Sequence, residues 1–272
     1  MADYSTIKGF TVQTLASDPY ASAGASGTWA SGGAMNTARK QFSGAGTQTA
    51  TITAGGVTGG PSGTHGTATE TYNGTAWTET GHALNTSRGN AGMAGTTAGA
   101  LYIAGYVGPL PTDLVESYNG SAWSEVAETN TARRDGAGFG SSTSAVAASG
   151  AVAPAAYGTV NAETWDGTAW TEVGNVNGAR IEFSGSGSSS SAGMIFGGFS
   201  HPPDKFHDET ETWNGTSWTE VADLATGRQS TGAGSSISGS VSALLAGGHA
   251  PGYTAATEEW NVPGVTKTLT VS

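Results

Sequence analysis

Cysteine is absent from the 272 residues of this chain, which excludes disulfide bonds and metal sites built on thiolates. Charge is scarce too, because Asp, Glu, Lys and Arg make up only 11% of the chain, against a usual share of about 25%. The formal net charge of −11 argues against nucleic-acid binding through a basic face. We therefore expect no nucleic-acid partner and a surface made mainly of Ser, Thr, Gly, Asn and Ala.

Long apolar runs are missing as well. No stretch approaches the roughly 20 residues of a membrane-spanning helix, so we expect no membrane insertion. The segment Met1–Tyr4 begins neither a basic nor an apolar signal region, so no secretory signal is expected.

Glycine and large aromatic residues are abundant, with 44 Gly, eight Trp and eight Tyr. Collagen requires Gly at every third position, and that period is absent. Flexible linkers lack the large aromatic residues that need burial. The composition therefore favours an all-β protein in which Gly serves tight turns and close strand packing.

Four residue series recur with a common period near 47 residues. Tryptophans stand 46 to 48 residues apart, and an arginine follows each of them by 10 or 11 residues. Each period also contains a Glu-x-aromatic element and a Gly pair or its remnant. A period of about 40 to 50 residues is typical of propeller blades. The repeated residues are Trp29, Trp77, Trp123, Trp170 and Trp218; Arg39, Arg88, Arg133, Arg180 and Arg228; and Glu70, Glu116, Glu163, Glu211 and Glu258.

Each period predicts four antiparallel strands, as the unit of residues 88–126 illustrates. A Gly-rich run suits an innermost strand, where blades crowd the axis, and the apolar run 99–105 suits the next strand. Residues 115–118 and 121–126 predict a hairpin around Asn119-Gly120. We expect type I′ turns there and at the equivalent Asn-Gly or Asp-Gly pairs, with positive φ at both central residues. A propeller blade is a sheet of four antiparallel strands.

The two ends of the repeat region complement each other. The first element, 27–29, is a fourth strand without its third, and the last, 258–261, is a third strand without its fourth. We therefore predict five blades, the last of which is closed by an outer strand from residues 27–32. The predicted organisation is an N-terminal extended segment, a propeller and a strand-like tail: residues 1–26, 27–261 and 262–272.

The order of Arg, Gly-rich strand, apolar strand, Gly-Gly, Glu-x-aromatic, turn and Trp resembles the kelch motif over residues 27–261. Two units depart from it, with Gly105-Tyr106 and Ser149-Gly150 in place of Gly-Gly. The resemblance implies a kelch-like β-propeller, but no particular function, since such propellers serve many roles.

A narrower resemblance involves the segment 4–15, the Asn-Thr-Ala-Arg elements, the phrase 213–221 and the tail 266–271. These are similar to kelch-like structural proteins of marine bacteriophages, in particular cyanophages. The resemblance implies a non-enzymatic structural or appendage protein of the virion, in the neck, the tail or the capsid decoration. Its expected partners are other virion proteins. The alternative is a carbohydrate- or receptor-binding propeller whose variable loops contact a glycan or receptor on the host surface.

The repeated ionisable and aromatic residues have two interpretations. Five arginines would bind an anion if they ringed a channel mouth, or each would pair with the glutamate of its own blade. We favour pairing, because five of the six arginines occupy one repeat position and each unit has one glutamate at a fixed place. The repeated tryptophans are expected to pack between blades.

His201, Asp204 and His207 form the densest group of potential metal ligands. Their spacing matches no standard metal site, so we expect an ordinary polar loop, without metal or cofactor. Catalysis is not expected either. Galactose oxidase, a kelch enzyme, needs a Tyr cross-linked to Cys, and no Ser-His-Asp order or Walker loop stands out here.

The terminal segments 5–15 and 265–271 alternate apolar and polar residues in β fashion. Two outcomes are open: they pair with each other, or they add to a sheet of a neighbouring subunit or of another virion protein. We expect these segments, rather than the blade loops, to attach the protein to the particle.

Overall fold

The computed structural model describes residues 32–59, 63–108, 110–153, 157–230, 232–234 and 242–261. The chain divides into two compact units, Met1–Gly32 and Gly33–Ser272, and the strands described below all belong to the second. These described residues contain no helix. In particular, none of them forms a helix of the length and apolar character that a membrane crossing requires.

In the described part of the chain, four antiparallel sheets have four strands each. The first contains β1 (Ser43–Thr47), β2 (Ala50–Ala54), β5 (Thr69–Tyr72) and β6 (Trp77–Glu79). The second contains β7 (Gly92–Thr96), β8 (Gly99–Val107), β9 (Leu110–Tyr118) and β10 (Trp123–Val126). The third contains β11 (Ala137–Ser141), β12 (Ser144–Ala148), β15 (Ala162–Trp165) and β16 (Trp170–Val173). The fourth contains β17 (Ser184–Ser189), β18 (Ala192–Phe196), β21 (Thr210–Trp213) and β22 (Trp218–Glu220).

A fifth sheet has three strands within the described ranges: β23 (Gly232–Gly234), β24 (Ser242–Ala246) and β25 (Thr257–Asn261). Short hairpins stand between the second and third strands of the first, third and fourth sheets. They are β3 (Val57–Thr58) with β4 (Thr64–His65), β13 (Ala151–Val152) with β14 (Tyr157–Gly158), and β19 (Phe199–Ser200) with β20 (Lys205–Phe206).

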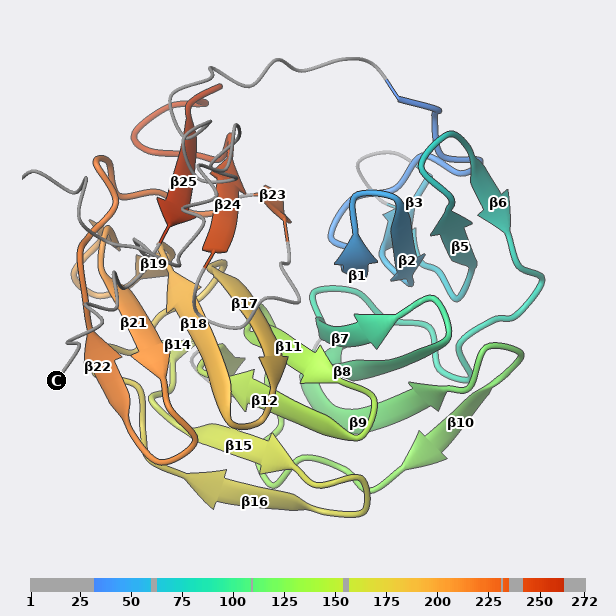
Figure 1. Cartoon of the computed structure of the whole chain (residues 1–272), viewed down its shortest axis with the longest axis horizontal. Coiled ribbons are helices and arrows are strands. Elements are labelled where there is room, and N and C mark those ends of the chain that lie inside the picture. Colours follow the sequence, from blue (N-terminus) through green and yellow to red (C-terminus); the bar gives the residue numbers. More distant parts are fainter. Residues whose placement is uncertain are drawn as a thin grey trace, which may run out of the picture. The chain divides into compact units, whose positions relative to one another are not determined.

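The sheets succeed one another around a common centre, with β1, β7, β11, β17 and β23 nearest to it (Figure 1). This is the arrangement of a β-propeller, and it confirms the all-β, propeller-like architecture predicted from the repeat. Four sheets of the described chain are complete four-stranded blades, where five were predicted. The outer strand expected from residues 27–32 falls almost entirely outside the described residues.

The innermost strands are rich in glycine because neighbouring sheets approach closely there. A Cβ atom on Gly92 would stand 2.9 Å from the backbone nitrogen of Gly138. A Cβ on Gly138 would stand 2.8 Å from the backbone nitrogen of Met93. Real Cβ contacts are not this short, so β7 and β11 pack at this distance only because both positions lack a side chain.

The outer hairpins form where they were predicted, but their turns are not of type I′. Tyr72 pairs directly with Trp77, which leaves a four-residue loop. Gly74 has a φ of 90°, whereas Asn73 does not adopt positive φ. Instead, the Asn73 Oδ1 atom accepts hydrogen bonds from the backbone N–H groups of Thr75 and Ala76, at 3.0 and 2.9 Å. The Asn side chain therefore caps the loop.

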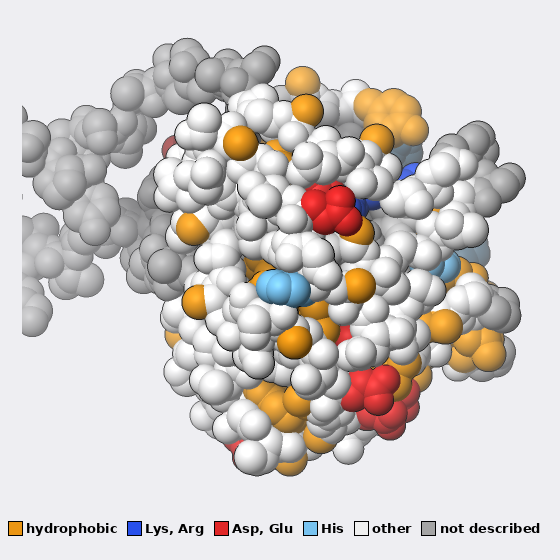
Figure 2. All heavy atoms as spheres, turned by 90° about the vertical axis from the view of Figure 1, so that its right-hand side faces the viewer, with side chains coloured by type: hydrophobic (Ala, Val, Ile, Leu, Met, Phe, Trp, Pro, Cys, Tyr) orange, Lys and Arg blue, Asp and Glu red, His pale blue; other side chains and the backbone are white. Residues whose placement is uncertain are grey.

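The hydrophobic core consists of clusters that lie between neighbouring sheets. One cluster joins the first and second sheets through Ile52, Tyr102 and Trp123. Similar clusters join the later neighbours, each with an aromatic or aliphatic side chain from both sheets. Most of the surface on the face shown in Figure 2 is neither hydrophobic nor charged, as the composition predicts.

Candidate functional site

A repeated arginine meets a repeated glutamate at the same place in each unit of the described chain. Both side chains of the Arg88–Glu116 pair are fully buried, with 2.6 Å between Nη1 and Oε1. Buried ions are tolerated only when they are paired and hydrogen-bonded. The pairs are Arg39–Glu70, Arg88–Glu116, Arg133–Glu163, Arg180–Glu211 and Arg228–Glu258.

Each pair fixes the segment that enters a sheet to that sheet's third strand. Glu70 accepts hydrogen bonds from the backbone N–H of Asn36 at 2.7 Å and from its side-chain amide at 3.0 Å. Arg39 Nη1 donates to the carbonyl oxygens of Gly55 and Ala68. Burial opposes ionisation of Glu70, but these hydrogen bonds outweigh it and lower its pKa. The arginines thus face glutamates and carbonyl groups, not an anion in a channel.

The repeated tryptophans Trp123, Trp170 and Trp218 are buried between sheets, whereas Trp77 is only partly buried. Trp123 Nε1 donates to Thr69 Oγ1 of the preceding sheet at 2.9 Å. The indole N–H groups of Trp170 and Trp218 are buried and have no hydrogen-bond partner among the described residues. Trp29 lies outside those residues. Packing between sheets, as predicted, is therefore what the structure shows for Trp123, Trp170 and Trp218.

The candidate metal ligands do not converge. His201 contacts Asp204 at an exposed position, whereas His207 is buried and its Nδ1 lies 2.8 Å from Glu209 Oε2. Within the described ranges, no three His, Cys, Asp or Glu side chains are grouped to hold a metal ion. Burial lowers the pKa of His207, and the hydrogen bond to Glu209 only partly offsets this. For Glu209, hydrogen bonds led by that from Lys205 outweigh burial and lower the pKa to about 2.

Five polar residues that were not predicted from the sequence to be functional stand two positions before the innermost strands. We call them the entry series: Gln41, Asn90, Asp135, Glu182 and Ser230. All have φ between 53° and 57°, a left-handed conformation that is uncommon outside glycine. From Asn90 onward, the backbone N–H of each member donates a hydrogen bond to the backbone carbonyl oxygen of the member before it in the sequence, at 2.8 to 2.9 Å. The sequence does contain a pattern that indicates this series, since the second residue after each repeated arginine is polar in every unit.

The residues that flank the entry series lead to a set of hairpins on the same end of the sheets. Arg134, one residue before Asp135, exchanges backbone hydrogen bonds with Ala151 at the start of the β13–β14 hairpin. The other units repeat this bridge. We call these hairpins the crown, which consists of the described residues within 57–65, 106–112, 151–158, 199–206 and 249–253.

Aromatic and histidine side chains connect neighbouring hairpins of the crown. The rings of His65 and Tyr106 are 5.6 Å apart, and those of Tyr157 and His201 are 5.9 Å apart. Phe206 and His249 form a third contact of this kind, at 5.4 Å.

The crown is also apolar toward solvent. Of the four large hydrophobic residues that are exposed in the described structure, Leu110, Tyr157 and Tyr253 belong to it. Tyr253 is 97% exposed. A concavity lined by Ser230, His249 and Tyr253 joins the last hairpin to the entry series. Exposed aromatic groups beside polar groups are what a recognition surface presents.

No protein-family model matches this chain, and no curated protein matches its sequence. The observations above define a class of fold: a propeller-like repeat protein that contains buried ion pairs and has hairpins at one end of its sheets.

Proposed function

We propose that this chain is a non-enzymatic structural or appendage protein of a virus particle. It serves in the neck, the tail or the capsid decoration of a marine bacteriophage and resides in the virion. The observation that carries the proposal is the repeated Arg–Glu pair, because it commits the repeated arginine and the repeated glutamate of every unit to the scaffold. The resemblance of the segments 4–15, 213–221 and 266–271 to phage proteins supports the setting.

The proposed fold is a five-bladed, kelch-like propeller. The three-stranded sheet of β23, β24 and β25 has the inner three strands of a blade, and residues 27–32 supply the fourth. Support comes from the Arg228–Glu258 contact, because it gives this sheet the same pair as the others. The partners are other virion proteins, bound through the segments 1–26 and 262–272, which lie outside the described residues. Self-association through these segments is included.

Mass spectrometry of purified particles tests the virion role. The chain is expected to be enriched in particles from a density gradient, in constant ratio to the major capsid protein across the peak. If it is abundant in the infected-cell lysate but absent from the particles, the virion role is wrong.

A second function is favoured by the crown: recognition of a glycan or receptor on the host surface. Its exposed tyrosines Tyr157 and Tyr253 offer ring faces, and Ser230 of the entry series lines a concavity beside Tyr253. The test is retention of the full-length chain on host cells. Replacing both tyrosines by alanine should abolish retention, whereas Thr219→Ala on an exposed outer strand should not. Equal retention of both variants would refute recognition by the crown.

A further inference from the structure

The crown hairpin of the three-stranded sheet is the shortest of the five. It comprises residues 249–253 and is closed by a bridge between His249 and Tyr253. The equivalent hairpins of the third and fourth sheets extend over residues 151–158 and 199–206. Beside the short hairpin lies an open concavity of about 450 Å³, within the range of roughly 300–1,000 Å³ that is usual for ligand pockets. We call it the hairpin pocket, and its described lining consists of Gln229, Ser230, Gly248, His249, Tyr253 and Thr254.

Two polar side chains stand next to each other in the wall of the hairpin pocket. The backbone N–H of Gln229 donates to the carbonyl oxygen of His249 at 3.0 Å, and the N–H of His249 donates to the carbonyl oxygen of Gln229 at 2.9 Å. Residues paired in this way on antiparallel strands have their side chains on the same face. Gln229 Oε1 and His249 Nδ1 are both buried, and neither has a hydrogen-bond partner among the described residues. Because buried polar atoms normally have a partner, the two atoms indicate that a ligand supplies it.

The scaffold does not require polar side chains at this bridge. The same backbone bridge occurs in every unit, but the residues that it joins differ from unit to unit. In each of the other units, at least one of the two residues has a side chain without hydrogen-bonding groups: Lys40–Val57, Gly89–Tyr106, Arg134–Ala151 and Ile181–Phe199. The combination of Gln229 and His249 is therefore not explained by the repeat.

Tyr253 gives the hairpin pocket an aromatic wall. Its ring lies 5.5 Å from that of His249, with an angle of 71° between the two planes. Phe206 contacts the same imidazole at 5.4 Å. Two rings thus hold the imidazole in place, whereas Tyr253 is 97% exposed and has nearly its whole ring available to a ligand. An aromatic ring beside a few polar groups is the usual lining of a ligand pocket.

The charges around the hairpin pocket argue against an anionic ligand. Its described lining contains neither Lys nor Arg. The carboxylate of Glu182 accepts a hydrogen bond from Ser230 Oγ, and its negative charge repels phosphate, sulfate and acidic sugars. A hydroxyl group suits the two unpaired atoms, because it can donate to Gln229 Oε1 and can either donate to His249 Nδ1 or accept from it, according to the tautomer.

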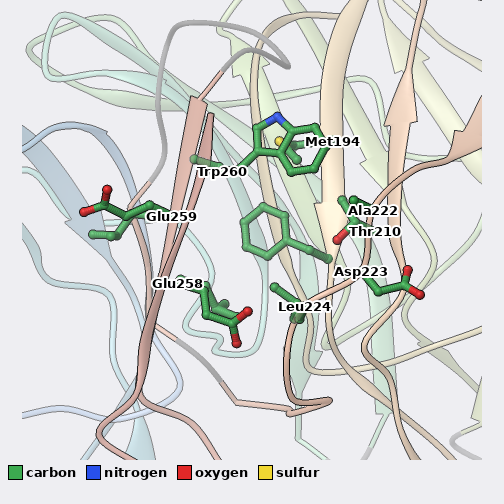
Figure 3. Close-up of a pocket in the computed structure, with 12 residues that line it drawn as sticks. Met194, Thr210, Ala222, Asp223, Leu224, Glu258, Glu259 and Trp260 are labelled. Carbon is green, nitrogen blue, oxygen red and sulfur yellow. The ribbon is translucent and has the colours of Figure 1, made fainter. Parts of the chain in front are cut away.

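A second cavity near the same sheet has a different character. It lies between the fourth sheet and the three-stranded sheet, and Figure 3 shows Trp260 and Met194 at one end and Leu224 at the other. Its volume of about 70 Å³ is well below the roughly 300 Å³ at which ligand pockets begin. Its size and its mostly apolar walls make it unsuitable for a hydroxylated ligand.

We propose that the hairpin pocket binds a neutral pyranose of a carbohydrate. One face of the sugar ring packs on the Tyr253 ring through its C–H groups. Two adjacent hydroxyl groups bind Gln229 Oε1 and His249 Nδ1. Because these two atoms are buried in the free chain, the sugar reaches them when the terminal amide or the imidazole turns toward the pocket. The inference rests on the host-surface recognition proposed for the crown, to which it assigns a site and a ligand class.

Binding of simple glycosides by the full-length chain tests the proposal. The probes are the methyl glycosides of glucose, galactose, mannose and N-acetylglucosamine, with glucuronic acid and inorganic phosphate as anionic controls. Saturation-transfer NMR shows which glycoside binds and which of its protons contact the protein, and a titration followed by protein NMR gives the Kd of every probe. We expect at least one methyl glycoside to bind, with the strongest transfer to its ring C–H protons, and we expect neither anion to bind.

Three variants locate the site. Tyr253→Ala and Gln229→Leu should each weaken glycoside binding by about tenfold, because they remove the ring face and the hydrogen-bond acceptor. Tyr157→Ala removes the other exposed tyrosine of the crown and should bind like the parent. All three should keep a Tm within about 2 °C of the parent, since both tyrosines are exposed and Gln229 Oε1 has no partner to lose among the described residues.

Absence of glycoside binding, tighter binding of an anion, or parent-like binding by Tyr253→Ala or Gln229→Leu overturns the proposal. Retention on host cells is a separate measurement, so the two proposals fail separately. If Tyr157→Ala/Tyr253→Ala loses retention although no glycoside binds the parent, the crown recognises a receptor other than a sugar, and only the ligand class is wrong. If a glycoside binds in the hairpin pocket but host cells do not retain the chain, the pocket stands and the host-surface recognition is wrong.

Discussion

The buried ion pairs should be essential to the scaffold, and Arg133→Ala is the sharpest test. The Arg133 side chain is 3% exposed, and that of its partner Glu163 is fully buried. Arg133 Nη1 also donates to the carbonyl oxygens of Ser149 and Asn161, at 3.0 and 2.9 Å. The alanine substitution removes these guanidinium donors. Glu163 then keeps its hydrogen bonds from the amide groups of residues 130 and 131, but it has no positive charge beside it.

Removing one member of a buried pair costs about 3–5 kcal/mol, because the remaining charge stays buried. For a domain of this size, the loss corresponds to a fall in Tm of about 10 °C. Urea unfolding followed by tryptophan fluorescence measures it, with the exposed Glu128→Ala as a control expected to stay within about 0.5 kcal/mol of the parent.

The double variant Arg133→Met/Glu163→Leu should lose less stability than Arg133→Ala, since it leaves no unpaired charge. A parent-like unfolding curve for Arg133→Ala would refute the structural interpretation. A parent-like curve together with loss of ligand binding would instead favour a functional arginine.

Three further predictions follow from the contacts between sheets, the buried titratable groups and the termini. Thr69→Val should destabilise the chain by about 1–2 kcal/mol in urea, because it leaves Trp123 Nε1 buried without an acceptor; no change would contradict this. Stability should decrease as the pH falls below about 6.5, because burial keeps His207 neutral in the fold while the unfolded chain takes up the proton. Stability should decrease again below about pH 4.5, because the pKa of Glu70 is lowered in the fold and its protonation removes its hydrogen bonds and its ion pair. Thermal melts across this pH range measure both decreases, and a Tm that does not change with pH would contradict both. Removing residues 263–272 should leave the urea midpoint unchanged but reduce incorporation into particles, whereas normal incorporation would move the attachment to the crown.

The sequence was sufficient to predict the four complete sheets and the Arg–Glu pairs because one physical solution recurs in every unit. A buried arginine needs a carboxylate partner, and in a repeat protein the partner lies at the same position of every unit. The spacing of Arg88 and Glu116 therefore identifies the corresponding pairs in the other units. The same logic placed Trp123 between sheets.

Other features escaped prediction for identifiable reasons. The turn type was wrong because the Asn73 side chain, rather than a second residue with positive φ, satisfies the loop N–H groups. The entry series was missed because its members share polarity and backbone conformation, not identity. His201 and His207 looked like one cluster, but the short strand β20 between them separates an exposed side chain from a buried one.

Electron cryomicroscopy of the purified particle tests the central claim most directly, since it shows whether this chain is a virion component and how it is oriented. We predict density with five sheets around one axis, the terminal segments toward the particle body and the crown turned outward. Particles without such density, or density in which the crown is buried against the particle body, would contradict it.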